Sequence, residues 1–282
     1  MRIVEKARAK LNLGLDTLYR HKDGSPEWNM IMTSIDLSDY VEIITTQGNS
    51  IHVSSSQVFL PHDQRNLAYQ AALLMKNTFD IKEKITINIK KNIPVAAGLG
   101  GGSSDAAAVI RGLNRIWNLN LSLKEMAVLG LKLDSDVPYC IYSKTAQVTG
   151  KGEIIKLMPK LPNMYFVLVK PRISVSTPEI LSNINYDNLK HVNINGLIDA
   201  VKKQDYPQIA KNIGNVLEPI SSKKYQDIFK IKAKFIKYGA DNAQMSGTGP
   251  SVFGLCKSER HAKHIFNSIR GFCSEVYIVK SM

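Results

Sequence analysis

The residues best suited to chemistry form a glycine-rich run in the middle of the chain. Four of the five residues from Gly98 to Gly102 are glycines, and Ser103, Ser104 and Asp105 follow directly, ahead of three alanines. Without Cβ atoms, the backbone N–H groups of such a run can converge on a ligand. The unpaired N–H groups and the dipole at a helix N-terminus attract an anion. The run therefore predicts a phosphate-binding loop leading into a helix that Ser103, Ser104 and Asp105 cap.

The same run departs from two familiar phosphate-binding patterns. No lysine follows the glycines, as the P-loop requires, and Ser103 stands where a dinucleotide fingerprint counted from Gly98 needs glycine. A flexible turn, or a tight contact between a helix and a sheet, is the plainer alternative. We consider it weaker because residues that cap helices follow the glycines at once.

A second segment, residues 134–139, carries two carboxylates ahead of a proline. Pro138 disfavours the helical conformation at Val137, so Asp136 is expected at the edge of a strand or turn. Two interpretations of Asp136 are open at this point: its carboxylate acts as a general base, or the residue simply stabilises a turn.

Two further segments are uninformative when taken alone. Lys10 and Asn12 share one face of a predicted strand, opposite Leu11 and Leu13, where they bind a substrate or face water. Residues 245–251 form a second glycine-rich turn ahead of a buried strand.

Apolar periodicity predicts the elements that position these segments. Period-two alternation predicts strands around Leu11 and Ile87, and residues 66–79 and 104–117 each carry one apolar helical stripe. Ser122 and Glu125 form a capping box, and a hairpin is expected through residues 149–152. Beyond them we expect strands at 165–169, 251–256 and 276–279, and helices at 197–217, 223–238, with Gly239 at its end, and 259–269.

The order of these elements predicts an α+β protein of two domains, because strands and helices mix without a strict βαβ rhythm. Two prolines within residues 158–163 disfavour both helix and central strand there. We therefore place a linker at this point and divide the chain into residues 1–158 and 159–282.

Composition narrows the class of protein. The 282 residues are 44% hydrophobic and 22% charged, which excludes disordered and collagen-like chains. No apolar run approaches the length of a membrane span, the first residues show no apolar signal region, and three cysteines without CxxC spacing favour neither a disulfide framework nor a zinc site. We expect a soluble, cytoplasmic protein with no membrane partner and no cluster of metal-ligating residues.

Charge is the ambiguous feature. The 37 lysines and arginines exceed the 24 aspartates and glutamates, for a formal net charge of +13. Such an excess suits nucleic acid, phosphorylated substrates or simply a solvated lysine-rich surface. One group alone recurs at helical spacing, namely Lys223, Lys224, Lys230, Lys232, Lys234 and Lys237.

Taken together and in this order, the four segments resemble the signatures of the GHMP kinase superfamily. They are Lys-x-Asn from Lys10, Pro-x3-Gly-Leu-Gly-Gly-Gly-Ser-Ser-Asp from Pro94, Asp-Val-Pro from Asp136, and Ser-Gly-Thr-Gly-Pro from Ser246. The resemblance covers almost the whole chain and implies a ribosomal-protein-like N-terminal domain and a ferredoxin-like C-terminal domain. It is greatest to members that use ATP and Mg²⁺ to phosphorylate a cytidine-diphosphate-linked alcohol in the synthesis of isoprenoid precursors.

The resemblance also implies roles for individual residues. Lys10 and Asp136 match catalytic positions, and Asn12 and Thr177 match positions that bind the substrate. The turn of residues 246–250 matches a motif that supports the phosphate loop. The residues that match the ATP-binding loop are Pro94, Val95, Ala96, Ala97, Gly98, Leu99, Gly100, Gly101, Gly102, Ser103 and Ser104.

Four positions depart from the family pattern. Ser25 and Pro26 replace a tyrosine and a histidine that hold the cytosine ring, Asp134 replaces a small residue, and Arg8 replaces a proline. Neither Ser25 nor Pro26 can stack on a base. Three readings follow: a kinase of the cytidine-linked alcohol, a GHMP kinase for another small alcohol, and a catalytically weak homologue that binds nucleotide or nucleic acid.

Overall fold

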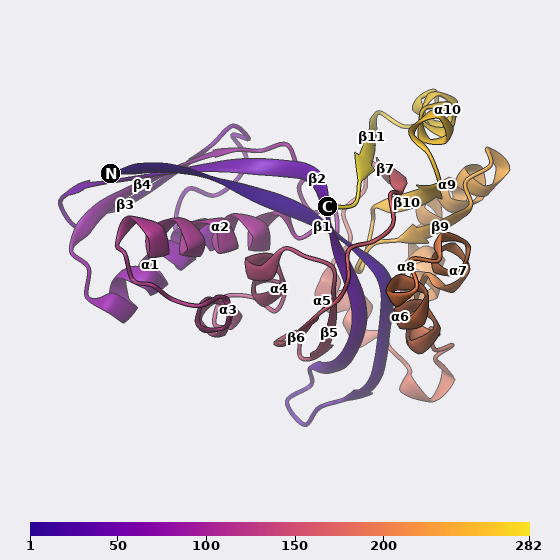
Figure 1. Ribbon diagram of the computed structural model, residues 1–282, viewed down its shortest axis with the longest axis horizontal. Coiled ribbons are helices and arrows are strands. Elements are labelled where there is room, and N and C mark those ends of the chain that lie inside the picture. The colour runs from indigo at the N-terminus through magenta and orange to yellow at the C-terminus, as the bar shows by residue number, and fades with distance from the viewer. The chain divides into compact units, whose positions relative to one another are not determined.

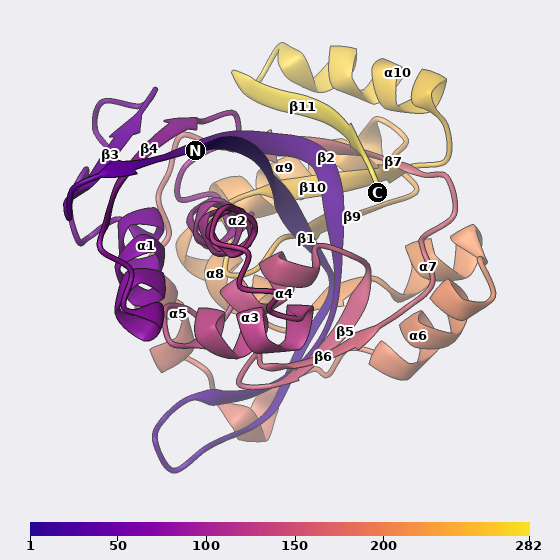
Figure 2. The same cartoon turned by 60° about the vertical axis from the view of Figure 1, so that its left-hand side comes forward.

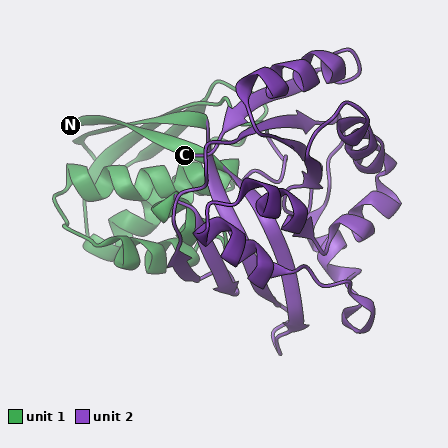
Figure 3. Ribbon diagram, turned by 45° about the vertical axis from the view of Figure 1, so that its right-hand side comes forward, with its two compact units in different colours: residues 1–9, 37–94, 100–143 green, residues 10–36, 95–99, 144–282 purple.

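The computed structural model describes residues 1–282 and divides into two compact units, coloured separately in Figure 3. Unit 1 comprises residues 1–9, 37–94 and 100–143, and unit 2 comprises residues 10–36, 95–99 and 144–282. Strands β1 (Arg2–Arg20) and β2 (Pro26–Gln47) therefore contribute to both units. The predicted linker at 158–163 lies inside unit 2, and the division at 158 and 159 stays a prediction.

Unit 1 places helices against strands (Figures 1 and 2). Residues 40–47 of β2 pair antiparallel with β4 (Glu83–Lys90), and β3 (Ile51–Ser55) pairs parallel with β4. Helices α1 (Leu67–Phe79) and α2 (Gly101–Ile116) pack side by side, and α3 (Leu123–Leu131) and α4 (Val137–Tyr142) follow. The predicted alternation around Ile87 is confirmed, because Ile85, Ile87 and Ile89 are buried and the residues between them are partly exposed.

Local capping explains where the helices of unit 1 begin. The side chain of Asn66 accepts from the N–H of Ala68 to start α1, and the predicted capping box of Ser122 starts α3. Helix α2 differs from the prediction: Gly100 is its N-cap, no side chain caps it, and Ser103 to Asp105 lie within the helix. The place of Asp136 also differs from the expected edge of a strand or turn, because Asp136 is the N-cap of α4. Pro138 occupies the first turn of this helix, where a backbone N–H has no partner within the helix, so the N–H that proline lacks is not needed.

Unit 2 contains an antiparallel sheet in the order β11-β7-β10-β9, made of Glu275–Lys280, Tyr165–Lys170, Val252–Cys256 and Asn242–Met245. All five residues of β10 are buried. A Cβ at Gly254 would lie 2.5 Å from Cδ1 of Phe235 in α9 (Gln226–Lys237), so the glycine lets this helix approach the sheet closely. Helix α10 (Glu259–Arg270) contacts β7, β10 and β11.

The remainder of unit 2 is built on the strands that both units share. Strand β5 (Ala146–Gly150) pairs with residues 28–32 of β2 and forms the predicted hairpin with β6 (Ile154–Leu157). The two residues of β8 (Gly214–Asn215) pair parallel with Gly14 and Leu15 of β1.

Two helices predicted as continuous are divided. The segment 197–217 contains α6 (Ile194–Lys202) and α7 (Tyr206–Asn212), separated at Gln204 by a φ of +57°, and then β8. The segment 223–238 is divided at Tyr225 between α8 (Glu218–Lys224) and α9. A short helix α5 (Thr177–Ser182) and a 3₁₀ turn (Tyr186–Asn188) precede them. None of the helices is both long enough and apolar enough to cross a membrane.

Candidate active site

The glycine-rich run connects β4 to α2 and is built for close backbone approach. Ala96, Gly98 and Gly100 have φ values of +51°, +72° and +67°, in the left-handed region that glycine tolerates best. Because no side chain caps α2, the N–H groups of its first turn stay available to a ligand. The predicted side-chain cap is thus wrong, and the anion-binding character of this helix start stays a prediction.

The serines after the glycines hold the start of α2 in place within unit 1. The hydroxyl of Ser104 donates to the carbonyl of Arg8 at 2.5 Å, and the hydroxyl of Ser103 donates to Oδ1 of Asp134 at 2.9 Å. The same carboxylate oxygen accepts from the N–H of Asp136 at 3.0 Å. Asp134, a departure from the family pattern, thus connects the first turn of α2 to the residue that begins α4.

A buried ion triad lies beside this turn. Nζ of Lys91 donates to Asp105 at 2.7 Å and to Asp39, and the three side chains are each at most 5% exposed. Asp39 also accepts from the N–H groups of Asn92 and Ile93. Lys91 precedes the glycine-rich run and Asp105 follows it, so the triad fixes both ends of the run.

Burial raises the pKa of Asp105 to about 7, with Lys91 opposing the rise and Asp39 adding to it. The second carboxylate oxygen of Asp105, Oδ1, has no hydrogen-bond partner. A carboxyl whose pKa is raised on folding favours the folded state fully at low pH, and this contribution is lost as pH rises from about 4 to about 7.

We expect Lys91→Met to lower the free energy of unfolding by about 3–5 kcal/mol at pH 8, because it leaves two buried carboxylates without a cation. Asp105→Asn keeps the shape of the side chain and the Lys91–Asp39 pair, so it should lower the free energy of unfolding much less. As pH rises from 5 to 8, the free energy of unfolding of Asp105→Asn should increase relative to that of wild type, because the amide does not ionise. Urea unfolding at both pH values measures these differences. Equal losses in the two variants would contradict the conclusion that Lys91 is the cation on which both buried carboxylates depend.

The polar pair on β1 is buried rather than solvated. Lys10 and Asn12 are 4% and 1% exposed, and Nζ of Lys10 donates to Oδ1 of Asn12 at 2.7 Å. The prediction that Lys10 and Asn12 share one face of the strand is confirmed. The alternative that these two side chains face water is wrong. The N–H of Lys10 donates to the carbonyl of Leu99 at 3.0 Å, which connects β1 to the glycine-rich run inside unit 2.

The second glycine-rich turn lies against the first. The hydroxyl of Ser246 donates to the carbonyl of Gly98 at 3.1 Å and accepts from the N–H of Asn12 at 3.4 Å. A Cβ on Gly98 would lie 2.5 Å from the carbonyl oxygen of Ser246 and 2.8 Å from that of Gly249, so no larger residue fits without moving the turn. The turn of residues 246–250 thus supports the glycine-rich run.

Asn215 holds this turn and was not found from the sequence. Its side-chain amide donates to the carbonyls of Met245 at 2.9 Å and Gly247 at 2.7 Å, and its Oδ1 accepts from the N–H of Leu217. A lone asparagine thirty residues from the turn gives no local signal, and only the parallel pairing of β8 with β1 brings it there.

Thr177, predicted to bind the substrate, begins α5. Its hydroxyl lies 2.8 Å from the hydroxyl of Thr248 in the supporting turn. Unit 2 therefore brings together Lys10, Asn12, residues 97–99 and this turn, with Thr177 at its edge. Unit 1 holds residues 100–104, Asp134 and Asp136.

Strand alternation separates two faces of the hairpin between β1 and β2. The side-chain amide of Asn12 contacts Sδ of Met30 at 3.4 Å, so Met30 shares the face of Asn12, and Trp28, two residues earlier on β2, does so as well. Glu27, at an odd-numbered position of β2, lies on the other face and pairs with His21 at 2.8 Å. Ser25 lies at the hairpin tip, where its hydroxyl donates to Asp23 at 2.6 Å.

Comparison with known proteins gives matches along the whole chain. The model of the GHMP kinases N terminal domain matches residues 66–144, and that of the GHMP kinases C terminal domain matches residues 197–275. The chain is similar to proteins named 4-diphosphocytidyl-2-C-methyl-D-erythritol kinase from Levilactobacillus brevis, at 57% identity, and Lactiplantibacillus plantarum, at 55%. The first match covers 100% of both chains, and the second covers 99% of this chain and 98% of the relative.

Solved structures give the same result. A crystal structure of 4-(cytidine 5'-diphospho)-2C-methyl-D-erythritol kinase matches with a TM-score of 0.82 and 27% identity, covering 99% of each chain. Homoserine kinase from Cytophaga hutchinsonii matches with a TM-score of 0.79 at 19% identity, over 100% of this chain and 94% of that one, which is a likeness of fold alone. The expected α+β architecture of two domains is confirmed by these matches.

Proposed function

Since the chain belongs to the GHMP kinase family, we propose that it transfers the γ-phosphoryl group of ATP to the 2-hydroxyl of 4-diphosphocytidyl-2-C-methyl-D-erythritol, a step in isoprenoid precursor synthesis. The chain is a phosphotransferase with an alcohol acceptor. The observation that carries the proposed substrate is the name shared by relatives that are 55–57% identical over the full length.

In this proposal, residues 94–104 bind the phosphates of ATP. The hydroxyl oxygen of the substrate bonds to the γ-phosphorus as the bond from that phosphorus to the ADP oxygen breaks, and Asp136 accepts the hydroxyl proton. Lys10 supplies a positive charge that stabilises the ionised Asp136 and polarises the hydroxyl. Asn12 and Thr177 bind the substrate. Support for these roles comes from the motif match together with the burial of Lys10 and Asn12 and the uncapped start of α2.

Mg²⁺ belongs to the proposal as the partner of ATP. No group of three or more acidic, histidine or cysteine side chains is placed to hold a metal. Mg²⁺ takes one or two protein oxygens and completes its coordination with substrate phosphates and water, so the Ser103 hydroxyl and the Asp134 carboxylate fit this requirement. When bound, the ion neutralises charge on the phosphates.

The proposal also includes a domain boundary and a cellular location. A boundary between domains at residues 158 and 159 is supported by family models that match on either side of it. We also propose that the enzyme acts in the cytoplasm on a small molecule.

The test of the proposed function is the mass of the product. The protein is incubated with Mg·ATP and with 4-diphosphocytidyl-2-C-methyl-D-erythritol, mevalonate or homoserine in parallel. We expect a gain of one phosphoryl group in the cytidine-linked alcohol alone. Phosphorylation of a different alcohol would favour the second candidate, a kinase for another small alcohol. The observation that favours this candidate is the presence of Ser25 and Pro26, which cannot stack on a base.

We propose that the aromatic ring of Trp28 compensates for Ser25 and Pro26 in holding the cytosine base. Trp28 is half-buried and shares the face of Asn12, whereas Tyr19 lies on the other face of the hairpin. Stacking of a base on an aromatic ring is worth about 1–3 kcal/mol. We expect Trp28→Leu to raise the KM for the cytidine-linked substrate about 10- to 100-fold, with the KM for ATP unchanged.

The control for this prediction is Tyr19→Ala, which removes a ring from the opposite face and should leave both KM values unchanged. If Trp28→Leu has no effect while Ser25→Tyr with Pro26→His lowers the KM, the base-binding side of the site is degraded rather than compensated.

A further inference from the structure

The lysine-rich helix α9 carries charged side chains that the proposed kinase reaction does not use. Of the lysines that recur along residues 223–237, Lys224 pairs with Glu179 and Lys232 pairs with Glu218. Lys230 and Lys234, four residues apart on one side of α9, have no carboxylate within ion-pairing distance, and both line a cavity of about 580 Å³ inside unit 2.

The walls of this cavity come from three separate elements. They are α9, the end of β7 with the two residues after it, and the connection from α10 to β11. These elements add Lys170, Arg172 and Arg270 to the two lysines, against a single lining carboxylate, Asp227. Like charges gathered around one concave surface raise its positive potential, which an anionic ligand lowers.

Few of these cations are neutralised by the protein. Lys170 lies 3.8 Å from Glu275, a long ion pair, and Nε of Arg172 donates to the neutral hydroxyl of Ser274 at 3.1 Å. No carboxylate pairs with Arg172 or Arg270. The guanidinium of Arg172 therefore keeps donors for a phosphate, which it is shaped to bind in pairs.

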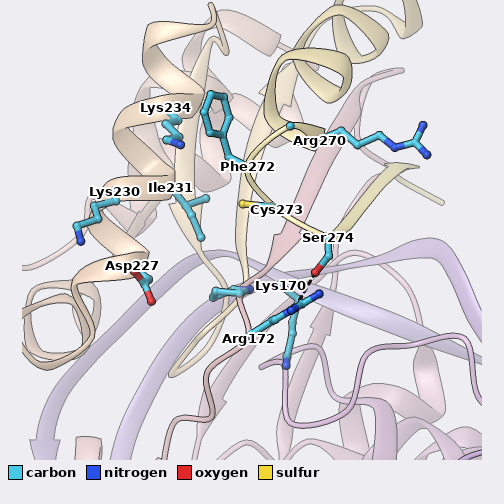
Figure 4. Close-up of a pocket in the computed structure, with 12 residues that line it drawn as sticks. Lys170, Arg172, Asp227, Lys230, Ile231, Lys234, Arg270, Phe272, Cys273 and Ser274 are labelled. Carbon is cyan, nitrogen blue, oxygen red and sulfur yellow. Dashed lines mark hydrogen bonds between the residues drawn. The ribbon is translucent and has the colours of Figure 1, made fainter.

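Figure 4 shows how the lining side chains are distributed. Arg172, joined to Ser274, lies at one end of the group and Lys234 beside Phe272 at the other, with Ile231 between them. Nζ of Lys234 is 3.3 Å from the centre of the Phe272 ring, which holds the ammonium group in place although the ring is 60% exposed. Arg270 extends away from the others in this view, so it adds charge without lining the centre.

We propose that this cavity binds a small organic diphosphate at a site separate from the glycine-rich run. Cations at both ends suit two linked phosphate groups better than one. The cavity volume falls within the range typical of small-molecule sites, and Ile231 and Phe272 offer apolar surface to an organic group. A concave site of this size is less suited to the extended backbone of a nucleic acid, for which positive charge along a groove is typical.

Inorganic pyrophosphate is the probe, titrated calorimetrically into the full chain in magnesium-free buffer. The test variant is Lys230→Gln with Lys234→Gln. Its control, Lys223→Gln with Lys237→Gln, removes the same charge at α9 and the adjacent end of α8 from positions that do not line the cavity. A second test variant, Arg172→Gln, changes the opposite end of the cavity.

We expect wild type and the control to bind pyrophosphate with equal affinity. Each test variant should bind it at least about tenfold more weakly, because a hydrogen bond to a charged group is worth about 1.5–3 kcal/mol. Pyrophosphate bound at the glycine-rich run would be common to all variants and would cancel in this comparison. Melting temperatures of the free proteins establish that every variant is folded.

The proposal fails if pyrophosphate does not bind, or if the test and control variants lose affinity equally, which would show a diffuse charge effect. It also fails if single-stranded RNA binds more tightly than pyrophosphate and loses its affinity in the test variants alone. That result would assign the cavity to nucleic acid.

Discussion

Replacing Asp136 with asparagine is expected to reduce kcat about 10²–10⁴-fold, because the amide keeps the shape of the side chain but cannot accept the proton of the attacking hydroxyl. Asp136 begins α4 and its N–H donates to Asp134, so the substitution leaves the local backbone contacts in place. Initial rates with saturating Mg·ATP and 4-diphosphocytidyl-2-C-methyl-D-erythritol measure the loss.

Nucleotide affinity separates a catalytic effect from a structural one. Asp136→Asn should bind ATP as wild type does, and Lys10→Ala should lose comparable turnover. A kcat for Asp136→Asn within a factor of a few of wild type would remove this residue from the mechanism, whatever the behaviour of Lys10.

Gly101→Val is expected to weaken ATP binding about 10- to 100-fold, which corresponds to the loss of a charge-assisted hydrogen bond. Gly101 is the first residue of α2, where in the proposed site phosphate oxygens approach the backbone. A Cβ there would lie 3.3 Å from Cγ2 of Ile93 and 3.4 Å from Nζ of Lys91, so the added side chain is also forced against the buried triad. Equilibrium binding of an ATP analogue measures the change.

The control is Gly271→Val, at the end of α10, where an added Cβ meets no atom within 4 Å. It should retain ATP affinity and stability. If Gly101→Val stays folded and binds ATP as tightly as wild type, the glycine-rich run is not the phosphate-binding loop.

Local signals in the sequence predicted much of the secondary structure. Helix α1 begins after Asn66 and α3 after Ser122, as their caps require, and the hairpin of β5 and β6 turns where two glycines stand. The prediction for α2 was wrong at its first turn, because Gly100 itself adopts the capping position and the serines turn inward.

The missing parts of the site depend on contacts between distant residues. Lys91 reaches Asp39 across 52 positions, and Asn215 supports a turn about thirty residues away. Neither residue belongs to a motif, and neither has a periodic neighbour that would mark it. The sequence carries the motif residues of the site, whereas the residues that hold those motifs in place are defined by tertiary pairing.

The interleaving of the two units has a consequence for synthesis of the chain on the ribosome. Every segment of unit 1 precedes residue 144, so its strands and helices are all synthesised by about the halfway point of translation. Unit 2 is different: the N–H of Met282 donates to the carbonyl of Ser34, and the N–H of Lys280 donates to Asp36. Residues 34–36 therefore complete these contacts only after residues 280–282 have been synthesised. Until then Ile35, which is fully buried in the folded chain, lacks these neighbours, and transiently exposed apolar surface of this kind favours aggregation.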